Sequence, residues 1–301
     1  MTTLSPTSPL FIGCATALVT PFREGEVDRD AFVRILRHQI TGGADALVVC
    51  GTTGESPTLT DKEKQWLFTT AVREVKASGK PIPVLAGTGS NNTSRAVELS
   101  RLAEACGVDG LLVVTPYYNK ASEAGLIGHY SAITAAVNLP VVVYHVPSRT
   151  GCRLTPQTCK ILSENPRIAG IKDATGDLSF TARVASLCGG ALPIYAGNDD
   201  QTLPILSLGG LGVISVVSNL YPDRVSRLCR LWREGRCAEA AALQLSLVPL
   251  CDALFSEVNP IPVKAGMALL GLCTEEVRLP LAAADCNLRE RVREAMGQGR
   301  Y

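Results

Sequence analysis

The chain has 301 residues, of which 46% are hydrophobic and 19% charged, enough to build a large buried core. Its 29 Lys and Arg residues and 28 Asp and Glu residues leave a net charge of +1, which does not favour nucleic acid or an anionic membrane as a partner. Residues 1–10 show neither a basic start nor an apolar run, and other apolar stretches look far shorter than the roughly 20 residues that span a bilayer. We therefore expect a soluble, cytoplasmic protein.

The cysteines and histidines do not resemble a metal site. Eleven cysteines, an odd number, are scattered from Cys14 to Cys286, many of them inside apolar patterns that are typical of buried free thiols. No two cysteines have the spacing of a zinc or redox site, and His38, His129 and His145 are not paired at metal-ligand spacing. We expect no metal and no disulfide framework.

Eight short runs rich in Val, Ile and Leu alternate with amphipathic segments, a pattern typical of βα units around a parallel sheet. The runs lie at residues 13–20, 45–51, 82–88, 110–116, 140–146, 168–173, 192–197 and 212–217. The clearest amphipathic segments, each opening near Asp, Thr or Ser as a helix N-cap would, are residues 28–41, 60–78, 93–106 and 122–137. Eight alternations within about 220 residues predict an α/β fold, a (β/α)₈ TIM barrel. An open doubly wound sheet would usually show fewer strands and a glycine-rich turn after the first one.

Helical patterns replace the strand signal after residue 222. They cover residues 224–232, 237–255 and 260–272, with no flexible linker before them. The sequence therefore predicts a catalytic barrel over residues 1–222 and a C-terminal helical region over residues 223–301 that packs on it.

Unusual polar residues follow six of the predicted strands, where the loops of such a barrel converge on one mouth. Lys172 is the most informative, because it ends the apolar run IAGIK and burial of its amine would favour the neutral form that attacks a ketone. The alternative is a structural lysine at the rim, paired with Asp173 or Asp177. Position alone does not choose between the two.

Four further side chains at the same mouth favour catalysis. Tyr144 ends another strand, and its phenol could relay protons if it met a hydroxyl partner. Thr52 and Thr53 lie in a Gly-Thr-Thr-Gly turn that suits a carboxylate, and Arg149 follows a proline turn where it could bind a carboxylate in a bidentate fork. Each has an ordinary alternative: a core tyrosine, a Ser/Thr-rich turn or a solvated arginine.

Six motifs, in order, make the chain resemble one enzyme family. GTTGES, GTGSNN, VTPYYN, YHVPSRTG, GIKDATGD and GVISV are similar to the motifs of the 4-hydroxy-tetrahydrodipicolinate synthase (dihydrodipicolinate synthase) family, over roughly residues 10 to 295. The resemblance implies a homotetrameric lyase of the class I aldolase type that joins pyruvate to aspartate 4-semialdehyde in lysine and diaminopimelate biosynthesis. It implies no cofactor other than the covalent Schiff base.

The resemblance also implies roles for individual residues. Lys172 matches the Schiff-base lysine, and the proton relay matches Tyr144, Thr52 and Tyr118, the last reaching into a neighbouring subunit's site. The substrate-binding positions match Thr53 for the pyruvate carboxylate, Arg149 for the semialdehyde carboxylate, and Gly197 and Ile214 for backbone groups that border the site. His145 departs from the asparagine of many members, and we expect it to point away from the pocket, packed and hydrogen-bonded.

A possible regulatory pocket is implied at Ser56, Asp61, Lys64, Asn91, Arg95 and Tyr117, which match the positions that contact L-lysine in feedback-sensitive members. Those members typically place histidine at Asp61 and Lys64 and glutamate at Arg95. Because Arg95 and Lys64 would repel an ammonium group, we expect weak or absent inhibition by L-lysine.

Two rival functions are open. N-acetylneuraminate lyases and sugar-acid aldolases or dehydratases share the lysine and the tyrosine, but they typically resemble Gly-Ser-Thr-Gly-Glu in the first motif and lack an arginine at Arg149. A sensor that merely binds a keto acid would not need the relay of Tyr144, Thr52 and Tyr118. Both comparisons favour the synthase.

Overall fold

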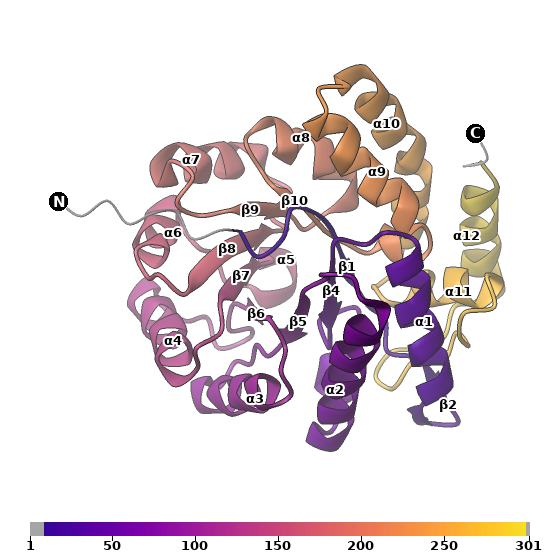
Figure 1. Ribbon diagram of the computed structural model, residues 1–301, viewed down its shortest axis with the longest axis horizontal. Helices are drawn as coiled ribbons and strands as arrows, with labels where there is room; N and C mark the ends of the chain where they lie inside the picture. Colours follow the sequence, from indigo (N-terminus) through magenta and orange to yellow (C-terminus); the bar gives the residue numbers. More distant parts are fainter. Residues whose placement is uncertain (1–8, 299–301) are drawn as a thin grey trace.

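The computed structural model describes residues 9–298. Residues 1–8, which carry most of the expectation about the N-terminal segment, lie outside the described residues. Eight parallel strands close into a barrel in the order β1-β10-β9-β8-β7-β6-β5-β4, which confirms the predicted TIM barrel (Figure 1). The strands are β1 (Gly13–Ala17), β4 (Ala46–Val49), β5 (Val84–Gly87), β6 (Gly110–Val114), β7 (Val141–His145), β8 (Ile168–Asp173), β9 (Ile194–Ala196) and β10 (Gly212–Ser215).

Helices form a ring outside the strands (Figure 1). Around the barrel they are α1 (Arg29–Thr41), α2 (Asp61–Ser78), α3 (Thr93–Ala105), α4 (Glu123–Ala136), α5 (Pro147–Thr150), α6 (Pro156–Ser163), α7 (Leu178–Cys188) and α8 (Thr202–Ser207), with the short 3₁₀ turns η1 (Ser56–Thr58), η2 (Asp199–Gln201) and η3 (Val217–Asn219). The expected N-caps are present: the side chains of Asp28 and Ser122 accept from the first turns of α1 and α4, and Thr60 forms a capping box with Glu63. The hairpin of β2 (Phe22–Arg23) and β3 (Glu26–Val27) was not predicted, because two-residue strands carry no periodic signal.

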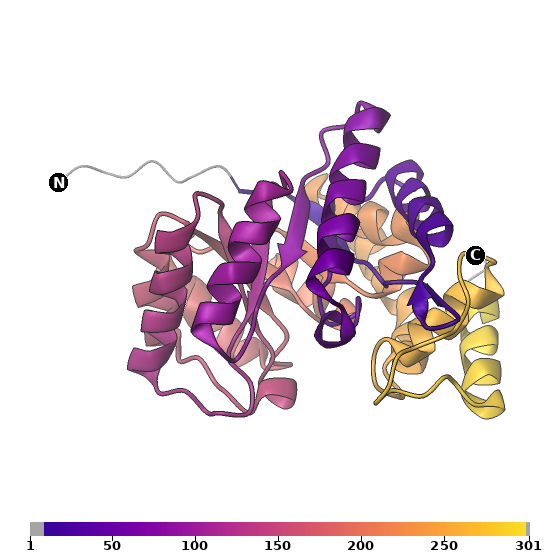
Figure 2. The ribbon, with the colours of Figure 1, turned by 90° about the horizontal axis from the view of Figure 1, so that it is seen from below.

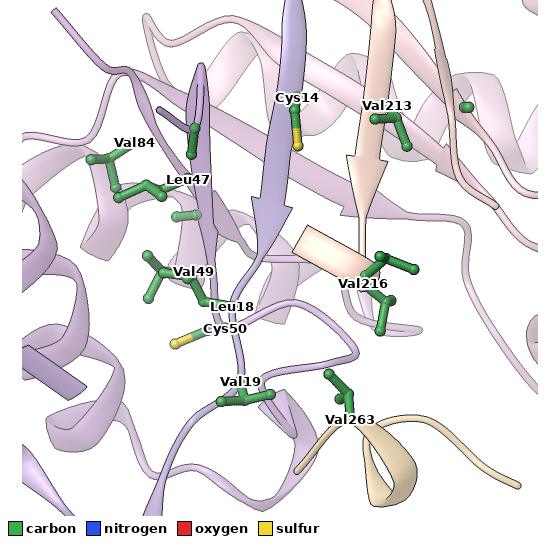
Figure 3. Close-up of a cluster of buried hydrophobic side chains, with 14 of the residues drawn as sticks. Cys14, Leu18, Val19, Leu47, Val49, Cys50, Val84, Val213, Val216 and Val263 are labelled. Carbon is green, nitrogen blue, oxygen red and sulfur yellow. The ribbon is translucent and has the colours of Figure 1, made fainter. Parts of the chain in front are cut away.

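Strand residues alternate between two cores, as the pleat requires. Ala46 and Val48 of β4 face the barrel interior, whereas Leu47 and Val49 face the helices. Figure 3 shows the outer core, where Leu47 and Val49 belong to the same cluster as Val263 of the C-terminal region. Eight of the eleven cysteines are buried, as their apolar surroundings predict.

The C-terminal region consists of α9 (Pro222–Arg233), α10 (Cys237–Leu254), α11 (Ile261–Leu269) and α12 (Cys286–Gln298), and α9 packs against β1. Figure 2 shows its last segments beside the N-terminal hairpin β2–β3. There, the Glu276 carboxylate accepts hydrogen bonds from the backbone N–H groups of Glu24 and Gly25, at 2.9 and 2.6 Å. The division of the chain at residue 222 stays a prediction.

A buried ion pair joins this region to the barrel. The Lys264 side chain on α11 is 0% exposed, and its Nζ lies 2.5 Å from Oε1 of Glu55, which is 2% exposed. The same Nζ donates to the backbone oxygen of Glu276 and lies 4.2 Å from the Phe22 ring centroid. Since Glu55 closes the Gly-Thr-Thr-Gly turn, the C-terminal region fixes the loop that carries Thr52 and Thr53.

One helix among residues 9–298 corrects the expectation that every apolar segment is short. By length and composition alone, the 18 residues of α10, with a mean hydropathy of 1.4, could cross a membrane. However, α10 packs against α9 and α12, and its Leu247, Leu250 and Leu254 side chains are buried. A core helix of a globular domain passes the same test, so this feature is weak evidence for a membrane span.

Candidate active site

The predicted lysine and tyrosine lie side by side at the barrel mouth. Lys172 on β8 and Tyr144 on β7 are register partners, and Nζ of Lys172 lies 4.3 Å from the centre of the Tyr144 ring. Both residues are buried. The parallel register of two neighbouring strands therefore brings together the two groups that the sequence placed at separate strand ends.

The Lys172 amine has no structural ion pair. Among residues 9–298, no carboxylate oxygen lies within 4.0 Å of its Nζ. The Asp173 carboxylate accepts hydrogen bonds from Thr175 and Thr181, and Asp177 caps α7. The alternative of a rim lysine held by Asp173 or Asp177 is therefore wrong.

Burial makes the Lys172 amine easier to deprotonate. Desolvation lowers its pKa to about 8; the negative charge of Asp199 opposes this shift and the positive charge of Arg149 adds to it. Asp199 is itself buried, with its carboxylate held by the Ser215 hydroxyl and by the backbone N–H groups of Val216 and Val217. Burial raises the pKa of this carboxyl group.

Asp199 is a site residue that the sequence reasoning did not single out. It stands in the motif AGNDD after β9, which offered two aspartates and no signal to choose between them. The choice depends on the fold, since Asp199 is 4% exposed whereas Asp200 points to solvent.

Tyr144 has the hydroxyl partner that a proton relay requires. Its phenol is hydrogen-bonded to the side chain of Thr52, which follows β4 on the opposite part of the barrel mouth. Burial raises the pKa of Tyr144 above its usual value, whereas the charge of Arg149 and the Thr52 bond act in the other direction. The phenol therefore stays protonated at neutral pH and can both donate and accept a proton.

Thr53 and Arg149 are connected through Asn259, a second residue that the sequence reasoning missed. The Asn259 side-chain N–H₂ donates to Oγ1 of Thr53 at 2.9 Å, and its backbone oxygen accepts from the Arg149 guanidinium at 3.4 Å. The Oδ1 atom of Asn259 is buried without a partner among the described residues. Because Asn259 stands in the C-terminal region, more than 100 residues from Arg149, no local pattern could have placed it here.

These residues enclose a cavity of about 180 Å³ at the barrel mouth. Its lining includes Thr52, Thr53, Tyr144, Arg149, Lys172, Gly197 and Asn259. A side chain at Gly197 would collide with Ala174, its Cβ lying 2.6 Å from that of Ala174, so glycine keeps this wall open. Ile214 lies deeper, fully buried among the interior side chains and outside the lining, so its role at the site stays a prediction.

His145 points away from the cavity, as expected from the strand alternation. It is 1% exposed, packs against Phe180 of α7 and accepts a hydrogen bond at Nε2 from the backbone N–H of Leu154 at 3.0 Å. Burial lowers its pKa to about 4, so the ring is neutral at physiological pH. The histidine therefore supports β7 from the outer side and does not enter the chemistry.

Tyr118 stands apart from the cavity of its own chain. It is 89% exposed and has φ of +72°, a backbone conformation that is rare for an aromatic residue. Its backbone N–H donates to the oxygen of Thr150, which fixes the loop while the ring projects outward. This placement agrees with a role in a neighbouring subunit, which stays a prediction.

A second cavity of about 560 Å³ adjoins the first and shares Thr52, Tyr144, Arg149 and Asn259 with it. Four of the six proposed regulatory residues line it: Ser56, Lys64, Arg95 and Tyr117. Asp61 forms an ion pair with Arg95, and Asn91 contributes its backbone oxygen to Asn119, so neither lines the cavity.

Comparison with known proteins identifies the family. The profile of the dihydrodipicolinate synthetase family matches residues 10–298. The chain belongs to this family. A relative from Clostridium novyi, named 4-hydroxy-tetrahydrodipicolinate synthase, is 44% identical over 287 residues, 95% of this chain and 96% of that protein. One from Pelobacter propionicus with the same name is 46% identical over 273 residues, 91% of this chain and 93% of that protein.

Solved structures of the family have the same fold. The dihydrodipicolinate synthase of Thermotoga maritima superimposes with a TM-score of 0.93 at 41% identity, covering 96% of this chain and 99% of that one. The enzyme of Cyanidioschyzon merolae, determined with lysine bound, gives a TM-score of 0.93 at 38% identity, covering 97% of this chain and 99% of that one. Both similarities extend through the C-terminal region.

Proposed function

We propose that this chain is a 4-hydroxy-tetrahydrodipicolinate synthase, a lyase of the class I aldolase type that condenses pyruvate with L-aspartate 4-semialdehyde. The observation that carries the proposal is the unpaired amine of Lys172, buried beside Tyr144 in a cavity whose other walls offer Thr53 and Arg149. The names of the relatives favour this activity over that of an N-acetylneuraminate lyase or sugar-acid aldolase.

The first stage joins pyruvate to the enzyme. The neutral Lys172 amine attacks the ketone carbon, and the resulting carbinolamine loses water to give an imine, with Tyr144 and Thr52 moving the protons. Thr53 holds the pyruvate carboxylate at the turn after β4. Loss of a proton from the pyruvate methyl group then converts the imine to an enamine.

The second stage forms the carbon–carbon bond. The enamine carbon attacks the aldehyde of the semialdehyde, whose oxygen takes up a proton and becomes a hydroxyl group. Arg149 binds the carboxylate of this second substrate through charge-assisted hydrogen bonds. The amine of the bound substrate then attacks the imine carbon, which closes the ring and releases Lys172 as a free amine.

The proposal extends to the setting of the enzyme. It requires no cofactor besides the covalent adduct on Lys172, and it places the enzyme in lysine and diaminopimelate biosynthesis in the cytoplasm. A homotetramer built as a dimer of dimers would bring Tyr118 into a neighbouring subunit's relay. The outward position of Tyr118 supports this assembly.

Borohydride trapping tests the proposal. Reduction in the presence of pyruvate should add one pyruvate-derived group to the enzyme, mapped by mass spectrometry to Lys172, and Lys172→Ala should abolish the addition. The matched control is Lys64→Ala, because Lys64 is another buried lysine that lines an adjoining cavity. Trapping that persists in Lys172→Ala, or disappears in Lys64→Ala, would disprove the assignment. Formation of product from aspartate semialdehyde then tests the second substrate.

A further inference from the structure

Lys64 is a buried lysine that the proposed reaction does not use. It lies on the inward face of α2, is 5% exposed, and lines the 560 Å³ cavity. Within residues 9–298, no carboxylate oxygen is found within 4.0 Å of its Nζ. A buried ammonium group without a partner is costly, so the absence of a counter-charge needs an explanation.

The acidic residues nearest in sequence to Lys64 are already bound to other cations. Asp61 forms an ion pair with Arg95, which also pairs with an exposed glutamate of its own helix. Glu63 is held by the Arg278 guanidinium, with 2.5 Å between Oε1 and a guanidinium nitrogen, and by the hydroxyl and N–H of Thr60. Neither carboxylate is therefore available to Lys64.

The remaining acidic group in the cavity wall is also engaged. Glu55 is bound by Lys264 on one oxygen and by the backbone N–H of Arg278 on the other. The nearby thiol of Cys50, which follows β4 (Figure 3), does not compensate either, because burial raises its pKa and keeps it neutral. Lys64 is thus a cation without a counter-charge in the wall of a cavity.

The other cavity walls indicate what could provide this charge. Leu59, Leu99, Val114 and Leu281 contribute apolar surface, and Ser56 and Tyr117 contribute hydroxyl groups. We propose that this cavity binds a small organic carboxylate, with its anionic group on Lys64 and an apolar body against these leucine and valine side chains. Polar groups at one end and apolar walls elsewhere are the usual construction of a small-molecule site.

The charge balance specifies an anion and excludes an amine. Arg95 and Asp61 neutralise each other, so Lys64 leaves one uncompensated positive charge. A carboxylate cancels it, whereas an ammonium group would add a second positive charge in a region shielded from water. The ligand class therefore differs from the amino acid that the family resemblance suggests for these positions.

Isothermal titration with three compounds of matching shape tests the proposal: 3-methylbutanoate, 3-methylbutanamide and 3-methylbutylamine. The protein is the intact enzyme after borohydride reduction with pyruvate, which blocks the Lys172 cavity, and in parallel Lys172→Ala, which needs no Schiff base. We expect saturable binding of the carboxylate in both, at least tenfold tighter than the amide, and no binding of the amine. Equal binding of acid and amide, or no saturable binding of the acid, would overturn the proposal whether or not the Schiff base forms.

Variants locate the bound carboxylate. Lys64→Met should weaken binding roughly tenfold to hundredfold, as the loss of a charged hydrogen-bond partner predicts, whereas Lys64→Arg should retain most of it. The matched control is Arg149→Met at the shared end of the two cavities, which should leave the affinity unchanged; loss in this variant alone would place the ligand at the active site and refute the inference. If Lys64→Met does not fold, the carboxylate should protect wild-type Lys64 from reductive methylation, mapped by mass spectrometry, and unprotected Lys64 would equally refute it.

Discussion

Schiff-base formation should follow the ionisation of Lys172, whose pKa burial lowers from 10.5 to about 8. Only the neutral amine attacks a ketone, so its fraction sets the rate of the first bond-forming step. With a pKa of about 8, about half of the amines are neutral at pH 8, against about 0.3% for an ordinary lysine. Burial therefore increases the reactive fraction about 150-fold at this pH.

The assay is the rate of pyruvate trapping at a low, fixed pyruvate concentration between pH 6 and 10. Because the folded-state pKa is depressed, the rate should rise about tenfold per pH unit below pH 8 and level off above it. Levelling near pH 10.5 would show that the amine is solvated and would refute the reasoning from burial.

Arg149 provides a control with a definite sign. Its positive charge lowers the pKa of Lys172, so Arg149→Met should move the plateau to higher pH, whereas Arg149→Lys, which keeps the charge, should move it less. An equal shift in both variants would mean that Arg149 acts through packing and not through its charge.

Three further outcomes follow from the same contacts. Arg149→Ala should leave pyruvate trapping largely intact but weaken use of the semialdehyde by about 2–3 kcal/mol, roughly a hundredfold, measured as kcat/KM; equal losses for both substrates would contradict this. L-lysine should inhibit weakly or not at all in initial-rate assays at saturating pyruvate, because Arg95 and Lys64 oppose an ammonium group, and potent partial inhibition would show that the expectation is wrong. Lys264→Met should destabilise the protein by about 3–5 kcal/mol in thermal or urea unfolding, since it leaves Glu55 buried without its main partner, and Lys264→Met combined with Glu55→Gln should recover part of the loss; a single variant as stable as wild type would refute the buried pair.

The barrel could be predicted from the sequence because its signal is local. Strand β8 was predicted at residues 168–173 and is observed as Ile168–Asp173, and the other seven agree within a few residues at each end. Each strand is a short apolar run bounded by turn residues, which one window of sequence can reveal. The hairpin β2–β3 is too short for such a window, and the full apolar length of α10 was missed because its polar residues interrupt the run.

The site was predictable only where its residues end strands. Lys172 and Tyr144 met because adjacent parallel strands bring their carboxyl ends to one mouth, and Thr52, Thr53 and Arg149 line the same cavity for the same reason. Asp199 and Asn259 could not be found in this way. The role of Asp199 depends on burial, and that of Asn259 on how the C-terminal helices pack against the barrel.

The contacts of the C-terminal region suggest why the family keeps it on the barrel. Asn259 connects Thr53 to Arg149, the two residues proposed to hold the two substrate carboxylates, and Lys264 fixes Glu55 at the end of the same turn as Thr53. Both connectors lie within six residues of each other at the start of α11. Because a catalytic geometry must be held by supporting contacts, removal of this short segment would loosen both carboxylate sites together while leaving Lys172 on its strand. The helical region is therefore part of substrate binding, although it provides none of the groups proposed to react with pyruvate.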